Sequence, residues 1–241
     1  MGILTLSPLV KCGLYAFFTI INIPILQGEE QSQCPSLTEN PICPCYNFKE
    51  GLFIECPSAT PSVVKNVIAK IKGSIQSLLI YDLESSITEL NSDLFPSQAK
   101  IINLQISQSN INTINPNAFI SLRDSLESLS IVSSKLKRIP EESISQLHNI
   151  ETLDLQHNEI KEIQANTFQH LKLNTINLKG NKIENISENA FHYLEETLTE
   201  LDISENFLYA FPLKPLENLT KLSSLRLAWN KIESIPNSLN V

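Results

Sequence analysis

The cysteines are the residues whose spacing restricts their chemistry most. Cys34, Cys43, Cys45 and Cys56 lie within one short segment, whereas Cys12 lies far upstream. Four such thiols could form two disulfides or hold a zinc ion. The segment lacks the paired Cys-x2-4-Cys spacing of structural zinc sites, so its pattern favours disulfides, which persist in oxidising compartments. We therefore expect a disulfide-bonded segment in an exported chain.

Side chains for catalysis show no comparable grouping. The sequence contains no G-x-S-x-G, H-E-x-x-H or phosphate-binding loop, and glycine is scarce, with 6 residues. Asp154 and His157 flank the end of one predicted strand, where a weak metal or acid–base site is conceivable. A catalytic site needs a convergent third group, so we interpret both as surface residues. The sequence predicts a protein that is not an enzyme and needs no cofactor or metal.

The balance of charge argues against two classes of partner. The formal net charge is -8, from 18 Lys and Arg against 26 Asp and Glu, and the basic residues are scattered. Proteins that bind nucleic acid usually carry a basic patch or stripe. The same sign argument disfavours an anionic membrane surface. We therefore expect neither nucleic acid nor a membrane surface as partner.

The first 28 residues have the pattern of an export signal. Lys11 ends a short N-terminal region, residues 12–26 are apolar apart from Thr19 and Asn22, and Gly28 suits the position before a cleavage. The apolar run has about 15 residues, which is short for a membrane-spanning helix of about 20. An uncleaved anchor is the alternative. We expect residues 1–28 to be removed and the mature chain to be secreted, with no insertion into a membrane.

Two sequons are consistent with export. Asn185-Ile-Ser and Asn218-Leu-Thr each match the acceptor pattern for N-glycosylation. We expect both asparagines to be glycosylated.

The strongest signal is an internal repeat with a period of 23 to 25 residues. Its consensus is L-x-x-L-x-L-x-x-N-x-L-x-x-I-x-x-x-x-F-x-x-L. The six clearest units begin at Ile101, Leu126, Ile150, Leu173, Leu198 and Leu222. A distorted unit precedes them at Ile75, and the last unit is incomplete. The pattern predicts a cysteine-rich N-terminal cap with a short helix in residues 29–74, followed by about seven repeats in residues 75–241.

The physics of the consensus predicts a solenoid. In L-x-L the apolar side chains share one face of a strand, and the residues between them face the other side. One unit cannot bury its apolar face alone, so units stack into a continuous core behind a parallel sheet. Asn at the ninth position can satisfy buried backbone groups; Ser109 and Ser134 replace it in two units. The Phe positions should stack into an apolar spine.

A helix is predicted between the cysteines and the repeats. Pro61 stands just inside its start and Gly73 just past its end. The apolar residues Val63, Val64, Val67, Ile68 and Ile71 form one face, which we expect to seal the cap onto the first repeat. The alternative is an exposed helix whose lysines, at positions 65, 70 and 72, form a binding patch.

Residues between the core positions of each strand should line the concave side of the solenoid. Repeat proteins use such extended concave faces for binding, although any solvated face would also be polar. The residues that we assign to a protein-binding concave face are Gln105, Ser130, Asp154, Gln156, Asn177, Lys179, Glu200, Asp202 and Arg226.

These features together resemble the extracellular leucine-rich-repeat family with a cysteine-rich N-terminal cap. The resemblance covers roughly residues 34–241. The cap PCPCYNFKEGLFIEC and repeats such as LQISQSNINTINPNAF are most similar to arthropod proteins of the chaoptin and Slit type and to the oplophorus-luciferin monooxygenase non-catalytic subunits. In such caps the first cysteine pairs with the third and the second with the fourth. The resemblance therefore implies Cys34–Cys45 and Cys43–Cys56.

The sequence thus predicts an α/β leucine-rich-repeat solenoid that binds a protein partner from outside the cell, and that could be the non-catalytic subunit of a complex. The alternative is the truncated ectodomain of a cell-surface receptor. Trp229, the only tryptophan, is expected to pack near the open end of the array; a contact anchor is the alternative. The last repeat has no evident cap, so we expect either a longer protein or a cover for that end, such as a dimer.

Overall fold

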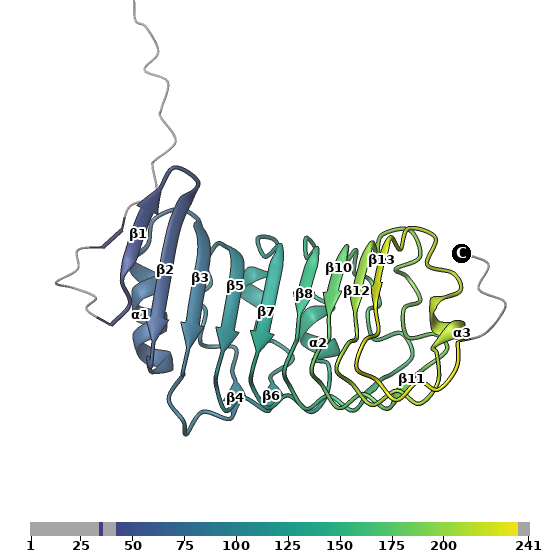
Figure 1. Ribbon diagram of the computed structural model, residues 1–241. Helices are drawn as coiled ribbons and strands as arrows, with labels where there is room; N and C mark the ends of the chain where they lie inside the picture. The colour runs from purple at the N-terminus through teal and green to yellow at the C-terminus, as the bar shows by residue number, and fades with distance from the viewer. Residues whose placement is uncertain (1–33, 36–41, 236–241) are drawn as a thin grey trace, which may run out of the picture. The chain divides into compact units, whose positions relative to one another are not determined.

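The computed structural model describes residues 34–35 and 42–235 (Figure 1). The chain divides into two units, Met1–Glu30 and Gln31–Val241. The predicted signal peptide, residues 1–28, lies outside the described residues. All the elements of the fold belong to the second unit.

A short β-hairpin forms the N-terminal cap. Strand β1 (Cys45–Phe48) pairs antiparallel with β2 (Gly51–Pro57). Disulfides join Cys34 to Cys45 and Cys43 to Cys56, which are the two pairs that the resemblance implies. Strand β2 also pairs in parallel with the first repeat strand, so the cap extends the sheet and covers its first edge.

Helix α1 (Pro61–Lys70) connects the cap to the repeats, where the sequence predicts a helix. The hydroxyl of Thr60 accepts a hydrogen bond from the backbone N–H of Val63 at 3.3 Å, which is the contact expected of an N-cap residue. Val64, Val67 and Ile68 are buried, whereas the lysines at 65, 70 and 72 are exposed. The apolar stripe therefore faces the core, as predicted.

One nine-stranded sheet runs through the whole unit, in the order β1-β2-β3-β5-β7-β8-β10-β12-β13, and every pairing after the cap hairpin is parallel. Figure 1 shows these strands side by side. The consensus leucine and isoleucine positions of the first six strands behind the cap are almost completely buried. The repeat strands are β3 (Ile75–Tyr81), β5 (Ile101–Ser107), β7 (Ser128–Val132), β8 (Thr152–Asp154), β10 (Thr175–Asn177), β12 (Glu200–Asp202) and β13 (Ser224–Arg226).

Shorter elements close the coils after the main strands. Two pairs of two-residue strands form there, and three short helices also lie between consecutive main strands. The strands are β4 (Glu89–Leu90) with β6 (Thr113–Ile114), and β9 (Glu162–Ile163) with β11 (Asn185–Ile186); the helices are η1 (Ile120–Leu122), α2 (Glu141–Ile144) and α3 (Leu213–Leu216).

Proline explains why the pairing of small strands does not continue through every repeat. The N–H of Asn115 donates to the carbonyl of Leu90, and the N–H of Ser187 donates to that of Ile163, each at 2.9 Å. Pro140 and Pro212 hold the same place in their repeats and have no N–H to donate. Helices α2 and α3 begin directly after these two prolines, since proline suits the start of a helix.

The predicted apolar spine is present behind the sheet. Phe95 lies 6.2 Å from Phe119, and Phe168 lies 5.8 Å from Phe191, measured between ring centroids. Ile144, which holds this position in the repeat between the two pairs, is fully buried. Large side chains at this position thus fill the outer part of the core.

A polar ladder lies beside the core, as the ninth consensus position predicts. In Asn181, the side-chain amide donates to the carbonyls of Leu155 and Leu178 at 2.9 and 3.0 Å, and its oxygen accepts from the N–H of Ile160 at 3.1 Å. Asn158, Asn206 and Asn230 make equivalent bonds to their own and the preceding repeat. These asparagines therefore join consecutive repeats.

Candidate interaction surface

The residues assigned to the concave face follow one line across the sheet. Strand register aligns Gln105 with Ser130, then Asp154, Asn177, Asp202 and Arg226 in turn. We call these six residues the concave row. Glu200 lies in the neighbouring line, beside Thr175, while Gln156 and Lys179 lie just after their strands. All nine assigned residues are half-buried or exposed.

Three members of the concave row have a structural task. The side-chain oxygen Oδ1 of Asp154 accepts from the N–H of Gln156 at 3.0 Å. Asn177 and Asp202 do the same for the residue two positions later, at 3.1 and 2.9 Å. This local contact turns the backbone out of the strand. These side chains therefore shape the face and present only their remaining atoms to a partner.

The charges of this region are largely paired with one another. Lys179 lies 3.1 Å from Glu205, and Arg226 lies 4.0 Å from Asp202. Burial raises the pKa of Asp154, while hydrogen bonds from Gln156 and Asn177 act in the opposite direction. Exposed ion pairs contribute little stability, so a partner could replace them at small cost.

In the part of the chain that the structure describes, Asp154 and His157 do not gather with a third His, Cys, Asp or Glu side chain. Asp154 bonds to Gln156, and His157 is exposed with a left-handed backbone, φ 55°. Its ring lies against Gly180, where a Cβ atom would collide with it. No group of three or more metal-ligating side chains occurs among residues 34–35 and 42–235.

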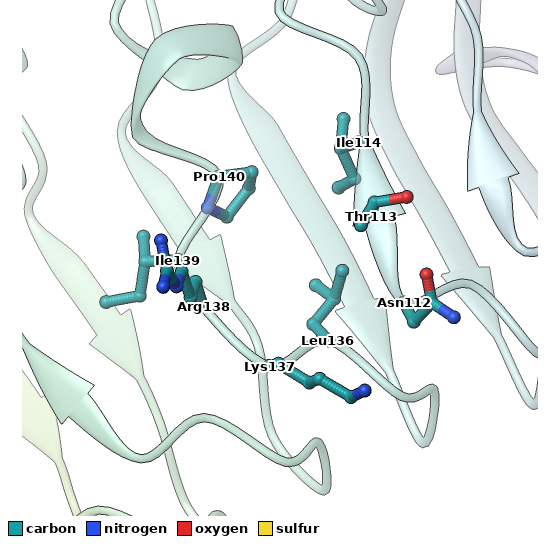
Figure 2. Close-up of a pocket in the computed structure, with 8 residues that line it drawn as sticks. All are labelled: Asn112, Thr113, Ile114, Leu136, Lys137, Arg138, Ile139 and Pro140. Atoms are coloured by element: carbon teal, nitrogen blue, oxygen red, sulfur yellow. The ribbon is translucent and has the colours of Figure 1, made fainter.

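A hollow of about 400 Å³ opens between two coils, beside Pro140. Figure 2 shows β6 and the next coil with the side chains that line it, from Asn112 to Ile114 and from Leu136 to Pro140. It lies where proline cannot bond to the preceding coil. Its lining combines apolar side chains with Lys137 and Arg138 and contains no acid–base pair.

Both predicted glycosylation sites lie away from the concave row. Asn185 is in β11, and Asn218 comes after α3; each is exposed. Sugars there would leave the concave face open.

Trp229 contradicts the prediction that it packs against the end of the array, because it is 82% exposed. The reason is its place in the repeat. It directly precedes Asn230 and has a left-handed backbone, φ 59°, and that conformation turns the side chain outward. The residues at this position in the other repeats are also left-handed, as is Ser58 after β2 of the cap: Asp82, Gln108, Ser133, His157, Gly180 and Glu205. Comparing repeats position by position would have revealed this line of side chains.

At the last described repeat, Leu225 and Ile235 are partly exposed, 37% and 61%. The predicted dimer through this end stays a prediction. No helix in the described part of the chain is both long and apolar enough to cross a bilayer.

Residues 124–183 match the family model described as leucine rich repeat. The fold is a leucine-rich-repeat solenoid with a disulfide-bonded cap. Among solved structures, similar folds occur in a Leptospira interrogans leucine-rich-repeat protein, the TLR13–ssRNA13 complex and the Drosophila Toll–Spatzle complex. Their TM-scores are 0.56, 0.53 and 0.58, at 22%, 21% and 15% identity; each match covers 76% of this chain and 50%, 32% and 26% of the other. This likeness concerns the fold.

Two curated relatives are similar to this chain over part of their length. The P-granule-associated novel protein 1 of Caenorhabditis elegans is 29% identical over 59% of this chain. The human volume-regulated anion channel subunit LRRC8A is 28% identical over 68% of it. The solenoid spans only 26% and 17% of these relatives. The narrower resemblance to chaoptin and Slit proteins stays a prediction.

Proposed function

We propose that the solenoid is a secreted scaffold whose concave face binds a protein partner. The observation that carries this proposal is the concave row, in which six polar side chains lie in register across consecutive strands. Solenoids of this type use that surface for recognition. The export-like N-terminus and the two disulfides support an extracellular location.

A role as the non-catalytic subunit of a complex fits the same observation, because recognition and chemistry would then lie on different chains. The alternative is the ectodomain of a receptor. Toll in the Toll–Spatzle complex has this fold and is bound to Spatzle, which favours keeping that alternative. The transcript decides between the two, since a receptor requires a spanning segment downstream of Val241.

Capture with the secreted chain as bait tests the proposal. We expect one protein to be retained by the wild type and its recovery to fall about tenfold with the double variant Glu200→Lys and Arg226→Glu, because both side chains are exposed and neither supports a buried group. Glu188→Lys, an exposed charge reversal between β11 and β12, is the matched control.

Equal recovery with all three proteins would contradict binding at the concave face. The same secreted material tests export. Endoglycosidase should lower its mass, and Asn185→Gln together with Asn218→Gln should remove that shift.

A further inference from the structure

The residues just after each main strand form three outward-facing lines. The first line holds the left-handed residue before the ladder position. The second and third lie one and three residues after the ladder position. From the unit at Ile101 onward, the first line is Gln108, Ser133, His157, Gly180, Glu205 and Trp229; the second is Asn110, Lys135, Glu159, Lys182, Phe207 and Lys231; the third is Asn112, Lys137, Lys161, Glu184, Tyr209 and Glu233.

Backbone hydrogen bonds between repeats fix the outward direction of the first line. The N–H of His157 donates to the carbonyl of Lys179, and the N–H of Glu205 donates to that of Ala228, each at 2.8 Å. Apart from Gly180, which has no side chain to present, every residue of this line is exposed, including those that have a further repeat stacked beside them. The exposure of Trp229 is therefore a property of its line and does not require an uncovered end of the array.

Aromatic residues enter these lines only in the units at Leu198 and Leu222, apart from the ring of His157. Phe207, Tyr209 and Trp229 are 38%, 61% and 82% exposed. Phe207 and Trp229 line the same hollow of about 460 Å³, together with Glu205, Asn206, Asn230 and Lys231. Exposed aromatic side chains gathered at one place are characteristic of the energetic centres of protein interfaces.

Lys231 gives this place its charge. Its ammonium lies 4.7 and 4.8 Å from the ring centroids of Phe207 and Tyr209 and 3.0 Å from the hydroxyl of Tyr209. Among the described residues, no carboxylate lies within 4.0 Å of this ammonium. Glu205, the carboxylate in the hollow, is already paired with Lys179 at 3.1 Å. Of the charged groups that line this hollow, the Lys231 ammonium is therefore the one without an ionic partner among the described residues.

We propose that Phe207, Tyr209, Trp229 and Lys231, which we call the aromatic edge, bind a protein segment that presents an apolar side chain beside a carboxylate. The rings would cover the apolar side chain, and Lys231 would pair with the carboxylate. This surface lies outside the concave row. Its binding should therefore survive Glu200→Lys with Arg226→Glu, so that the failure of one proposal is distinguishable from the failure of the other.

Three short peptides test this chemistry on the whole mature chain. The acidic probe is acetyl-Gly-Asp-Phe-Glu-Leu-Gly-amide; one control replaces both acidic residues by Lys, and another replaces Phe and Leu by Ser. Trp229 is the only tryptophan, so its fluorescence reports contact directly. Fluorescein-labelled peptides give affinities for all variants by anisotropy. We expect the acidic probe to bind at least about tenfold more tightly than either control.

Substitutions then assign the binding to its residues. Trp229→Asn removes the ring and suits a left-handed backbone, and it should weaken the acidic probe by about tenfold or more. Lys231→Gln should bring the acidic and lysine peptides to within about twofold of each other. Tyr193→Ser removes an exposed aromatic residue elsewhere, 44% exposed, and should change nothing.

Several results would overturn the proposal. They are absence of binding by the acidic probe, equal binding of all three peptides, and full binding by Trp229→Asn. Chitotetraose or maltotetraose that changes Trp229 fluorescence when the peptides do not would assign the edge to a carbohydrate. Self-association that Trp229→Asn abolishes would assign it to a second copy of the chain.

Discussion

Two kinds of repeat share the same core but differ at their polar positions. The serine units, beginning at Ile101 and Leu126, carry Ser109 and Ser134 in the polar ladder, whereas the asparagine units, beginning at Ile150, Leu173 and Leu198, carry asparagine. Strands β5 and β7 of the serine units have seven and five residues. Strands β8, β10 and β12 of the asparagine units have three each.

The difference in strand length results from the concave row. In the asparagine units Asp154, Asn177 and Asp202 accept the N–H two residues later and end the strand. The serine units have Gln105 and Ser130 there, and their strand pairing continues to Ser107 and Val132. In these five units the side chain in the concave row thus correlates with where the strand ends, whereas β13 ends at Arg226 without such a bond.

The polar ladder should show the largest energetic difference between the two kinds of unit. Asn181→Ala would leave the N–H of Ile160 without its side-chain acceptor in a buried place, whereas the carbonyls of Leu155 and Leu178 would keep the amides of Asn158 and Asn206. Since one buried unsatisfied group costs about 1–3 kcal/mol, we expect a loss of roughly 2 kcal/mol in the free energy of unfolding. Urea denaturation followed by circular dichroism measures it.

Ser134→Ala is the matched control in a serine unit. Within the described residues, Ser134 donates only to the carbonyl of Val132, at 3.3 Å, so its loss should cost about 1 kcal/mol or less. Equal losses for the two variants would show that the ladder does not distinguish the units.

Much of this fold was predictable from the sequence because burial follows periodicity. The leucine and isoleucine positions and the bonding of Asn158 to buried backbone groups follow from single positions in a repeat, and the helix between Thr60 and Gly73 follows from its boundary residues and apolar spacing. The exposure of Trp229 follows only from a comparison of the same position across all repeats, because it depends on a left-handed backbone shared by non-glycine residues. Likewise, the role of Asp154 depends on a bond to Gln156, which a polar pattern alone does not distinguish from a free carboxylate.

Converting a serine unit into an asparagine unit should add stability. Ser134 is buried, and within the described chain no hydrogen bond joins it to the N–H of Ile111, whereas Ser109 accepts the N–H of Leu83 at 3.2 Å. Ser134→Asn places a longer acceptor at this position. We expect a gain of about 1 kcal/mol in the free energy of unfolding, the value of one net hydrogen bond. A loss, measured by the same urea titration, would show that the serine units are too closely packed for asparagine.

We expect the smallest effect on stability from removing the charge of Asp154. Asn177, the aligned residue of the next repeat, makes the same bond without a charge. Burial raises the pKa of Asp154 in the folded chain, so its ionisation costs free energy as the pH rises through that pKa. Asp154→Asn keeps the acceptor for Gln156 and removes the charge. It should therefore raise the denaturation midpoint at about pH 7, and the gain should disappear below about pH 3, where the carboxyl is protonated in both the folded and the unfolded state. If the variant were instead less stable at neutral pH, the charge-assisted bond to Gln156 would outweigh the cost of burial. The negative charge of Asp154 would then strengthen the bond that ends its strand, whereas Asn177 makes the equivalent bond without a charge.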